Sequence, residues 1–207
     1  MEELFVKKLF GEINLTWKKT IAFAIITGVY TAIMALLPIT NDTSFSDITV
    51  NFEAWILFGI IIIMNSKSPK NSALKCFVFF LISQPLVYAV EVLFGPLTKD
   101  LAMYYYRTIW FPRTLLTLPG GFIAYYCKKQ NVLGAVVLGI GNAIQALMGV
   151  YYAAQAVSNF PHHLLSCLVS IGSIFLMTFQ IQKSKKCRII SLLIPLAMAI
   201  ACIIRML

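Results

Sequence analysis

Charged residues are scarce in this sequence, and a water-soluble fold is excluded on that ground. Asp, Glu, Lys and Arg together make up 12% of its 207 residues, whereas an ordinary soluble domain has about 25%. Apolar residues reach 59%, and the mean hydropathy is +0.83. Because a spanning helix needs about 20 apolar residues, the chain has room for several spans and their loops, but for no separate soluble domain. We therefore expect an all-α transmembrane helix bundle that forms one integral membrane domain over residues 1–207.

The motifs of the common enzyme classes are also absent. The sequence contains no GxSxG, no HExxH and no glycine-rich phosphate loop, so it predicts no catalytic residue, no metal and no cofactor. Its five cysteines show no metal-ligand spacing. His162, His163 and Cys167 form a His-His-x-x-x-Cys string, which we interpret as an interfacial cap or a pH-sensitive rim rather than a metal site. An intramembrane enzyme that uses either histidine is an alternative that the sequence leaves open.

Seven apolar runs follow one another along the chain. Short polar stretches such as NSKSPKN (65–71) separate them, so consecutive helices should be antiparallel neighbours. The second run carries Glu53, and the seventh is short and contains Pro195, so six spans are the alternative to seven. The runs are Thr20–Pro38, Asp47–Met64, Ala73–Phe94, Leu101–Tyr126, Val132–Tyr152, His163–Ile181 and Ile189–Ile204.

Lys and Arg cluster in alternate connections between these runs. With a cytoplasmic N-terminus, thirteen of the seventeen cations and three of the eight acids lie on the inner side, as the positive-inside rule requires. Four cations and five acids then lie on the outer side. This distribution predicts a multi-pass plasma-membrane protein with its C-terminus outside. The net charge of +9 indicates contact with an anionic inner leaflet, and no pattern indicates a nucleic-acid partner.

The first nineteen residues have a different pattern from the apolar runs. Val6, Leu9, Phe10, Ile13 and Trp17 recur at helical spacing, which is typical of an amphipathic helix. We therefore expect residues 1–19 to form a helix in the inner membrane interface, and residues 20–207 to form the transmembrane bundle.

Polar residues inside the apolar runs are the candidates for function, because a charge at the centre of a spanning helix costs at least about 2.5 kcal/mol. With a rise of about 1.5 Å per residue, Glu53, Arg113 and Asn142 lie at nearly the same height above the inner boundary. In this interpretation Arg113 binds an anionic group, Glu53 or Glu91 binds a cationic one, and amides orient the ligand. The predicted substrate-binding residues are Glu53, Gln84, Tyr88, Glu91, Trp110, Arg113, Asn142, Gln145 and Tyr152.

Prolines and glycines concentrate on the same runs. Pro85, Pro112 and the Pro119–Gly121 segment would kink helices, and Gly139 and Gly141 would allow close approach. Kinked spans beside intramembrane charges occur in transporters that bind ions and substrates at broken helices. The same residues also suit tight helix packing, so both interpretations stay open.

Three segments carry a resemblance to known proteins. ILFGIIIIMNSKSP (56–69), ALKCFVFFLISQPLVY (73–88) and LPGGFIAYYCKK (118–129) resemble small multi-spanning bacterial membrane proteins without a known function. The resemblance implies a bacterial inner-membrane protein and implies no activity. By size and expected pocket the chain is also similar to the substrate-capture subunits of energy-coupling-factor importers. Those subunits usually have six helices and an alanine-rich docking patch, whereas we expect seven spans and find no AxxxA motif on the first.

We interpret the sequence as an integral membrane protein that binds or transports a small polar solute through an outward-facing cavity. The chain has no ATP-binding motif, so a gradient or a membrane partner subunit would supply the energy for transport. The alternative is a non-transporting accessory or immunity-type membrane protein whose buried charges are structural.

Overall fold

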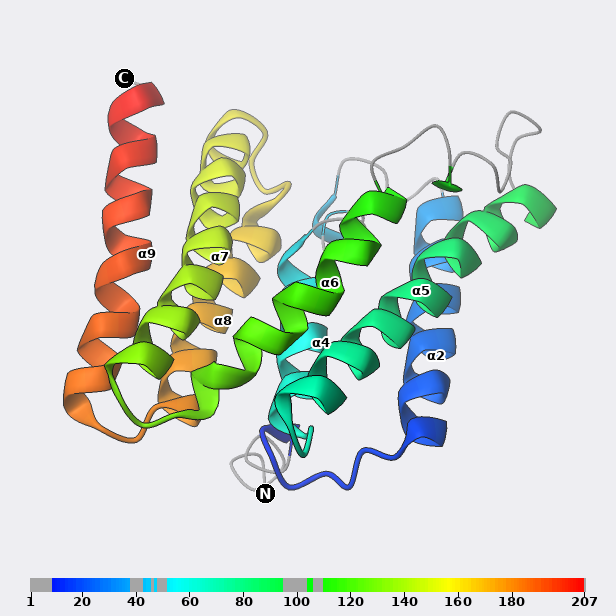
Figure 1. The fold of residues 1–207 in the computed structure, drawn as a ribbon. Coiled ribbons are helices and arrows are strands. Elements are labelled where there is room, and N and C mark those ends of the chain that lie inside the picture. The colour runs from blue at the N-terminus through cyan, green and yellow to red at the C-terminus, as the bar shows by residue number, and fades with distance from the viewer. Residues whose placement is uncertain are drawn as a thin grey trace.

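The computed structural model describes residues 9–37, 43–45, 47, 52–94, 104–105 and 110–206, without the side chains of 52, 53, 91 and 206. These residues form an all-α bundle and contain no strand (Figure 1). The elements are α2 (Trp17–Leu36), α4 (Phe52–Met64), α5 (Pro69–Phe94), α6 (Trp110–Ala124), the 3₁₀ turn η3 (Tyr125–Lys128), α7 (Val132–Ser158), α8 (Leu164–Ile181) and α9 (Lys185–Met206).

Each of the seven α-helices falls on one of the seven apolar runs, so the predicted helical bundle is confirmed. Helices α2, α5, α7, α8 and α9 are long and apolar enough to cross a membrane. Helix α4 is shorter, with an apolar stretch from Ala54 to Met64, and α6 has 15 residues. The sequence therefore located the helices correctly, and five of them qualify as spans by length and composition.

Polar side chains fix where several helices begin. The Thr16 hydroxyl accepts from the backbone N–H of Lys19 at the start of α2. In the same way the Ser68 hydroxyl accepts from Asn71 N–H at the start of α5, and the Asn131 side chain accepts from Gly134 N–H at the start of α7. Each of these caps satisfies a backbone donor that a helix end would otherwise leave without a partner.

The helices are arranged in two groups with α4 between them (Figure 1). Helix α7 packs closely against both α8 and α9, and α5 packs closely against both α2 and α6. Helix α4 lies among α5, α6, α7 and α8 and contacts each of them only sparsely along the backbone. Helix α4 is therefore held by contacts of its side chains, rather than by closely apposed backbones.

Glycines set the closest approaches within each group. A β-carbon on Gly28 of α2 would lie 2.8 Å from the Ser83 carbonyl oxygen of α5. A β-carbon on Gly139 of α7 would lie 2.6 Å from Ile194 of α9. Small residues at helix crossings let the two backbones approach, and the close contact stabilises the pair through dispersion attraction. This matters in a membrane, where burial of apolar surface gives helices no driving force to associate.

An aromatic cluster packs α4 against α2 and α5. The ring of Trp55 lies 5.7 Å from that of Phe80, and the ring of Phe23 lies 4.9 Å from that of Phe79. Phe58 contacts Phe23 edge-on at 5.5 Å. Phe79 is fully buried and Trp55 is 6% exposed. These offset and edge-on pairs contribute beyond the area that they bury, and they hold the short α4 in place.

The N-terminal segment differs from the predicted interfacial helix. Residues 1–8 lie outside the described residues, and Phe10–Thr16 form turns and extended backbone before α2 begins at Trp17. The Asn65 side chain explains this shape, because it donates to the Leu9 carbonyl at 2.6 Å and accepts from Ile13 N–H at 2.8 Å. Gly11 has a φ of +134°, which other residues rarely adopt. One continuous helix from Val6 to Trp17 is therefore wrong, since the described part is a loop held against the end of α4.

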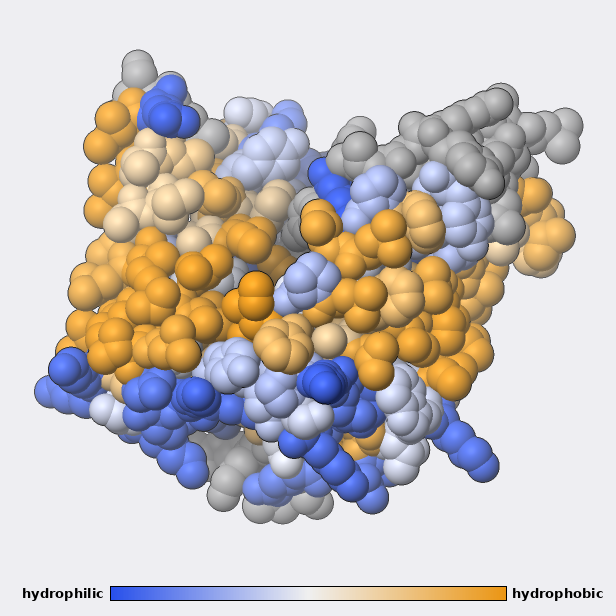
Figure 2. Space-filling view, in the orientation of Figure 1, coloured by the Kyte–Doolittle hydropathy of each residue, from blue (hydrophilic) through white to orange (hydrophobic). Residues whose placement is uncertain are grey.

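Lysines collect at one end of the bundle. Figure 2 shows a broad hydrophobic band across the visible face, with a row of hydrophilic residues below it. The lysines at this end stand at the starts of α2, α5 and α9 and at the ends of η3 and α8, and they are Lys18, Lys19, Lys67, Lys70, Lys128, Lys129, Lys183, Lys185 and Lys186. We call this the basic end.

Buried polar contacts brace the basic end. The Lys128 ammonium donates to the Ser66 carbonyl at 2.7 Å and lies 4.5 Å from the Tyr125 ring centroid. Burial lowers the pKa of Lys128 from its usual value, and burial raises the pKa of the adjacent Cys127 thiol to about 12. Gln182 donates to the Cys127 carbonyl at 2.7 Å. Cys127 is therefore a neutral, structural thiol at ordinary pH.

We predict that Gly28→Ala lowers the free energy of unfolding by about 1–3 kcal/mol, because the new methyl group would overlap the backbone of α5. Gly172→Ala in α8 is the matched control, because no atom lies within 4 Å of its β-carbon position, and it should be neutral or slightly stabilising. Thermal unfolding in a neutral detergent measures both. Equal stabilities for the two variants would contradict the close α2–α5 crossing.

Candidate functional site

A cavity of about 430 Å³ lies between α4, α5, α6 and α7. We call it the central cavity. Residues from these four helices line it, and they are Trp55, Ile56, Gly59, Ile60, Ile63, Cys76, Phe80, Gln84, Trp110, Arg113, Thr114, Leu116, Thr117, Gly120, Gly121, Ala124, Gly141 and Ile144. Most of this wall is aliphatic or aromatic, with few polar groups. Such a lining is typical of small-molecule sites, in which a few placed polar groups orient a mainly apolar ligand.

Three glycines leave space in the wall rather than bringing helices together. No atom lies within 4 Å of the β-carbon positions of Gly59, Gly120 and Gly141, which come from α4, α6 and α7. All three line the central cavity. Gly121, next to Gly120, behaves differently, because its β-carbon position is 3.1 Å from the backbone of Ala73. Parts of the cavity wall on α4, α6 and α7 are therefore helix surface without a side chain.

Arg113 brings the strongest polar group to the cavity. It lies in the first turn of α6, and its guanidinium carbon is 4.9 Å from the centroid of the Trp110 ring. Stacking on an aromatic face restrains an arginine side chain and offsets part of its desolvation. Because a guanidinium has five N–H donors, it can bind an anion in the cavity while it also contacts protein groups.

The threonines of α6 anchor the wall next to Arg113. The Thr114 hydroxyl is 2.8 Å from the Tyr104 hydroxyl and 3.0 Å from the Trp110 carbonyl oxygen. The Thr117 hydroxyl donates to the Thr114 carbonyl at 2.6 Å. Gln84 faces the cavity from α5, one residue before Pro85. The polar groups of the site are therefore a guanidinium, an amide and two hydroxyls.

Three of the nine predicted binding residues line the central cavity together, namely Gln84, Trp110 and Arg113. Tyr88 lies one turn beyond Gln84 on α5, with its ring 5.8 Å from that of Tyr104. The side chains of Glu53 and Glu91 lie outside the described residues. An approach of Glu53 to Arg113 therefore stays a prediction.

The other three predicted residues lie on α7 and do not line the central cavity. Asn142 and Gln145 are fully buried, and Tyr152 is 1% exposed. The Asn142 side-chain nitrogen donates to the Thr178 hydroxyl at 2.9 Å and to the Ser191 carbonyl at 3.3 Å. The Tyr152 ring stacks on that of His163 at 6.2 Å. Asn142 therefore joins α7 to α8 and α9, and Tyr152 contacts the residue before α8, whereas Gly141 and Ile144 of α7 line the central cavity.

A second polar cluster stands at the end of the bundle opposite the basic end. The Asp47 carboxylate is 2.5 Å from His163 Nδ1 and accepts from the Ser166 hydroxyl at 2.8 Å. The Ser44 hydroxyl accepts from Ser166 N–H at 3.2 Å. Sequence reasoning missed this cluster, because Asp47 is more than a hundred residues away from α8. The only sequence signal was the His163-x-x-Ser166 spacing, which places both groups on one face of a helix start.

This cluster does not have the geometry of a catalytic triad. In a triad the serine hydroxyl binds the imidazole, so that the imidazole can remove its proton, whereas Ser166 here binds the carboxylate directly. An adjacent polar cavity of about 710 Å³ is lined by Asp47, Tyr151, Gln155, Asn159, Phe160, His162 and His163. Within the described residues no three His, Cys, Asp or Glu side chains could hold a metal ion. The cluster therefore docks the connection between α2 and α4 onto the start of α8.

No family model, no curated protein and no solved structure matches this chain.

We predict that Asn142 and Thr178 are energetically coupled. Asn142→Ala and Thr178→Val should each destabilise the protein, and the double variant should lose less than the sum by about 0.6–2 kcal/mol, the range of interhelical hydrogen bonds in membranes. Thermal unfolding of the four proteins in detergent gives the coupling energy. Strict additivity would show that the contact between α7 and α8 carries no free energy.

Proposed function

We propose that the protein is an integral membrane protein that binds a small amphiphilic anion in the central cavity. Five helices of sufficient length and apolar character support the membrane setting. One observation carries the binding proposal: three glycines with no neighbour at their β-carbon positions line the same cavity as Arg113 and Gln84. Gly59 is buried, so the space at its β-carbon position is an interior void, and such voids are costly in close-packed protein.

The chemistry of the wall selects the class of ligand. The aliphatic and aromatic side chains of α4 and α5 suit a hydrocarbon body, since they offer no hydrogen bonds to replace those of water. The Arg113 guanidinium suits a carboxylate, sulfate or phosphate. Gln84 and Thr117 can contribute hydrogen bonds near the charged group. This class differs from the small polar solute expected from the sequence, because the lining contains far more apolar than polar side chains.

The route of entry follows from which lining residues are exposed. Leu116 of α6 is 65% exposed and Ile144 of α7 is 43% exposed, so the cavity opens on the side of the bundle between these two helices. In a membrane this opening faces the hydrocarbon. An amphiphile can therefore enter from the bilayer with its chain and bring its head group to Arg113.

The charge distribution supports one orientation. We place the basic end at the cytoplasmic face, in line with the positive-inside rule. Helix α6 begins at the other end with Trp110 and Arg113, so the anion-binding part of the cavity lies toward the outer leaflet. Amphiphiles of the outer leaflet are thus the proposed source of the ligand.

A second candidate function is that of a non-transporting accessory or immunity-type membrane protein. The positions of Asn142, Gln145 and Tyr152 favour it, because these polar residues pack between helices instead of lining the cavity. In that case Arg113 and Gln84 would also serve packing, and their substitution would change stability without changing any binding.

We predict that 10-bromodecanoate quenches tryptophan fluorescence saturably, because its bromine would come close to Trp55 or Trp110 in the cavity. Arg113→Ala should weaken the apparent affinity about tenfold or more, since a hydrogen bond to a charged group contributes about 1.5–3 kcal/mol. Arg205→Ala, at the end of α9, is the matched control and should bind normally. The uncharged 10-bromodecanol should bind more weakly than the acid. Equal quenching of Arg113→Ala, Arg205→Ala and wild-type protein would rule out the proposed site.

We also predict that filling the cavity abolishes binding without unfolding the protein. Gly120→Leu and Gly141→Leu place a side chain into space that no atom occupies within 4 Å, so they should block 10-bromodecanoate while the melting temperature changes little. Gly172→Leu, also without neighbours but outside the cavity lining, is the control and should retain binding. If Gly120→Leu and Gly141→Leu bind the probe as wild type does, the ligand does not occupy the central cavity.

A further inference from the structure

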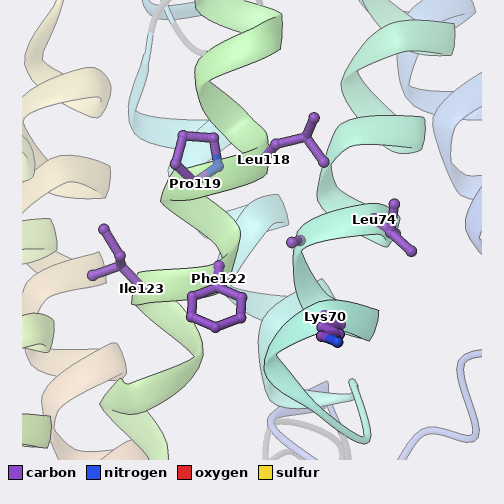
Figure 3. Close-up of a pocket in the computed structure, with 7 residues that line it drawn as sticks. Lys70, Leu74, Leu118, Pro119, Phe122 and Ile123 are labelled. Atoms are coloured by element: carbon purple, nitrogen blue, oxygen red, sulfur yellow. The ribbon is translucent and has the colours of Figure 1, made fainter.

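A groove on the outer surface of the bundle runs between α5 and α6 (Figure 3). It has a volume of about 590 Å³ and is lined by Lys70, Ala73, Leu74, Leu118, Pro119, Phe122 and Ile123. Figure 3 shows Lys70 and Leu74 on α5 across the groove from the side chains of α6, with Lys70 at its lower end. We call it the lateral groove. It is a separate site from the central cavity, because Gly121 closes α6 against α5 between them.

The two helices are held together at the back of the groove. The Ser72 hydroxyl donates to the Gly121 carbonyl at 2.9 Å, and the β-carbon position of Gly121 lies 3.1 Å from the Ala73 backbone. In front of this crossing the side chains diverge and stay exposed, with Leu74 at 48%, Phe122 at 39% and Ile123 at 57%. The groove therefore has a rigid floor and two apolar walls that face the surroundings of the bundle.

Lys70 gives the groove a polarity along its length. It stands in the first turn of α5, at the basic end, and its ammonium makes no hydrogen bond or ion pair with the described residues. The N-terminus of α5 adds a partial positive charge at the same place. At the same end of α6, the Phe122 ring lies 6.1 Å from that of Tyr126, over which the Lys129 ammonium lies at 4.7 Å. One end of the groove is thus cationic and aromatic, and the rest is apolar.

We propose that the lateral groove binds one anionic phospholipid of the cytoplasmic leaflet, with its phosphate at Lys70 and an acyl chain along Leu118, Pro119 and Phe122. The inference goes beyond the ligand of the central cavity and rests on the membrane setting proposed above. The positive charge of Lys70 is complementary to the negative phosphate. Its position at the basic end would place it at the depth of the lipid head groups in the membrane. A neutral lipid would leave that charge without compensation, and a hydrocarbon chain fills apolar walls that no described side chain covers.

The site has a consequence for α6, which is a wall of both the groove and the central cavity. Leu118, Pro119, Phe122 and Ile123 face the groove, whereas Thr117, Gly120 and Ala124 face the cavity. Pro119 lies inside the helix and removes one of its backbone hydrogen bonds. A lipid chain packed against this weakened turn would support α6 from the side that faces away from the ligand.

The test compares lipids and matched variants of the purified, lipid-free protein in a neutral maltoside detergent. Dioleoyl phosphatidylglycerol should raise the melting temperature at lower concentration than dioleoyl phosphatidylcholine does, and native mass spectrometry should detect one tightly held phosphatidylglycerol. Lys70→Ala should weaken the apparent phosphatidylglycerol affinity about fivefold, as expected for one basic residue at an anionic lipid surface. Lys186→Ala, which removes an exposed charge at the same end outside the groove, should behave as wild type.

A second pair of variants tests the acyl chain. Phe122→Ala should weaken binding of phosphatidylglycerol, whereas Phe175→Ala, which removes an exposed ring of α8, should not. Equal effects of Lys70→Ala and Lys186→Ala, or equal affinities for the two lipids, would overturn the proposal in favour of general attraction to the basic end. Displacement of the lipid by millimolar inorganic phosphate would overturn it in favour of a site for the head group alone.

Two further measurements distinguish a lipid site from a dimer interface and from the ligand site of the central cavity. A wild-type dimer that Phe122→Ala converts to a monomer would overturn the lipid proposal and make the groove an interface between two copies of the chain. Quenching by 10-bromodecanoate is measured on the same Lys70→Ala protein and should be unchanged in lipid-free detergent. If the wild-type protein shows no preference for phosphatidylglycerol but 10-bromodecanoate still quenches its fluorescence, the lipid site in the lateral groove is ruled out. The proposed ligand site in the central cavity is then unaffected.

Discussion

Helices in an apolar environment come together only where small side chains let their backbones approach, because hydrocarbon around them removes the usual gain from burying apolar surface. This constraint organises the whole bundle. Gly28 meets Ser83 between α2 and α5, Gly121 meets Ala73 between α5 and α6, and Gly139 meets Ile194 between α7 and α9. These crossings produce the two closely packed groups of helices. Where no such crossing exists, around α4 and between α6 and α7, the central cavity remains.

The helices could be predicted from sequence because apolar periodicity and length are local properties. All seven runs contain a helix, but the ends differ, since α7 continues past Tyr152 to Ser158 and α9 begins at Lys185 instead of Ile189. Helices continue through polar residues once they leave the apolar layer, and hydropathy alone does not report that. The prediction of a helix in the N-terminal segment was wrong for another reason. Its amphipathic spacing was real, but the distant Asn65 side chain binds its backbone and holds a loop, which no local pattern contains.

The candidate site could be predicted only in part. The sequence indicates how far along its helix a residue lies, but not which helix or cavity that residue meets. Gly141 and Ile144 line the central cavity, whereas Asn142, one residue after Gly141, bonds to α8 and α9, and Gln145 is fully buried outside the lining. Asn142 and Gln145 are polar and fully buried, as residues of a ligand site would be, so their polarity could not distinguish a cavity from a packed interface. The glycines were equally ambiguous. Gly120 and Gly121 are adjacent in sequence, yet the first borders open space and the second a backbone contact.

Arg113 shows why the cavity and the charge belong together. A guanidinium costs at least about 2.5 kcal/mol at the centre of a bilayer, and Arg113, in the first turn of α6, carries part of such a cost. A cation–π contact such as that of Arg113 with Trp110 stabilises the charge by about 0.5–2 kcal/mol. This is only a fraction of the free energy needed to remove an ion from water. The cavity that Arg113 lines, which glycines keep open in part, admits water or an anionic group, either of which solvates the guanidinium further. A packed wall at the same place would raise the free-energy cost of burying the Arg113 charge. The open space therefore stabilises the charged side chain, and the same charge attracts an anionic ligand into that space.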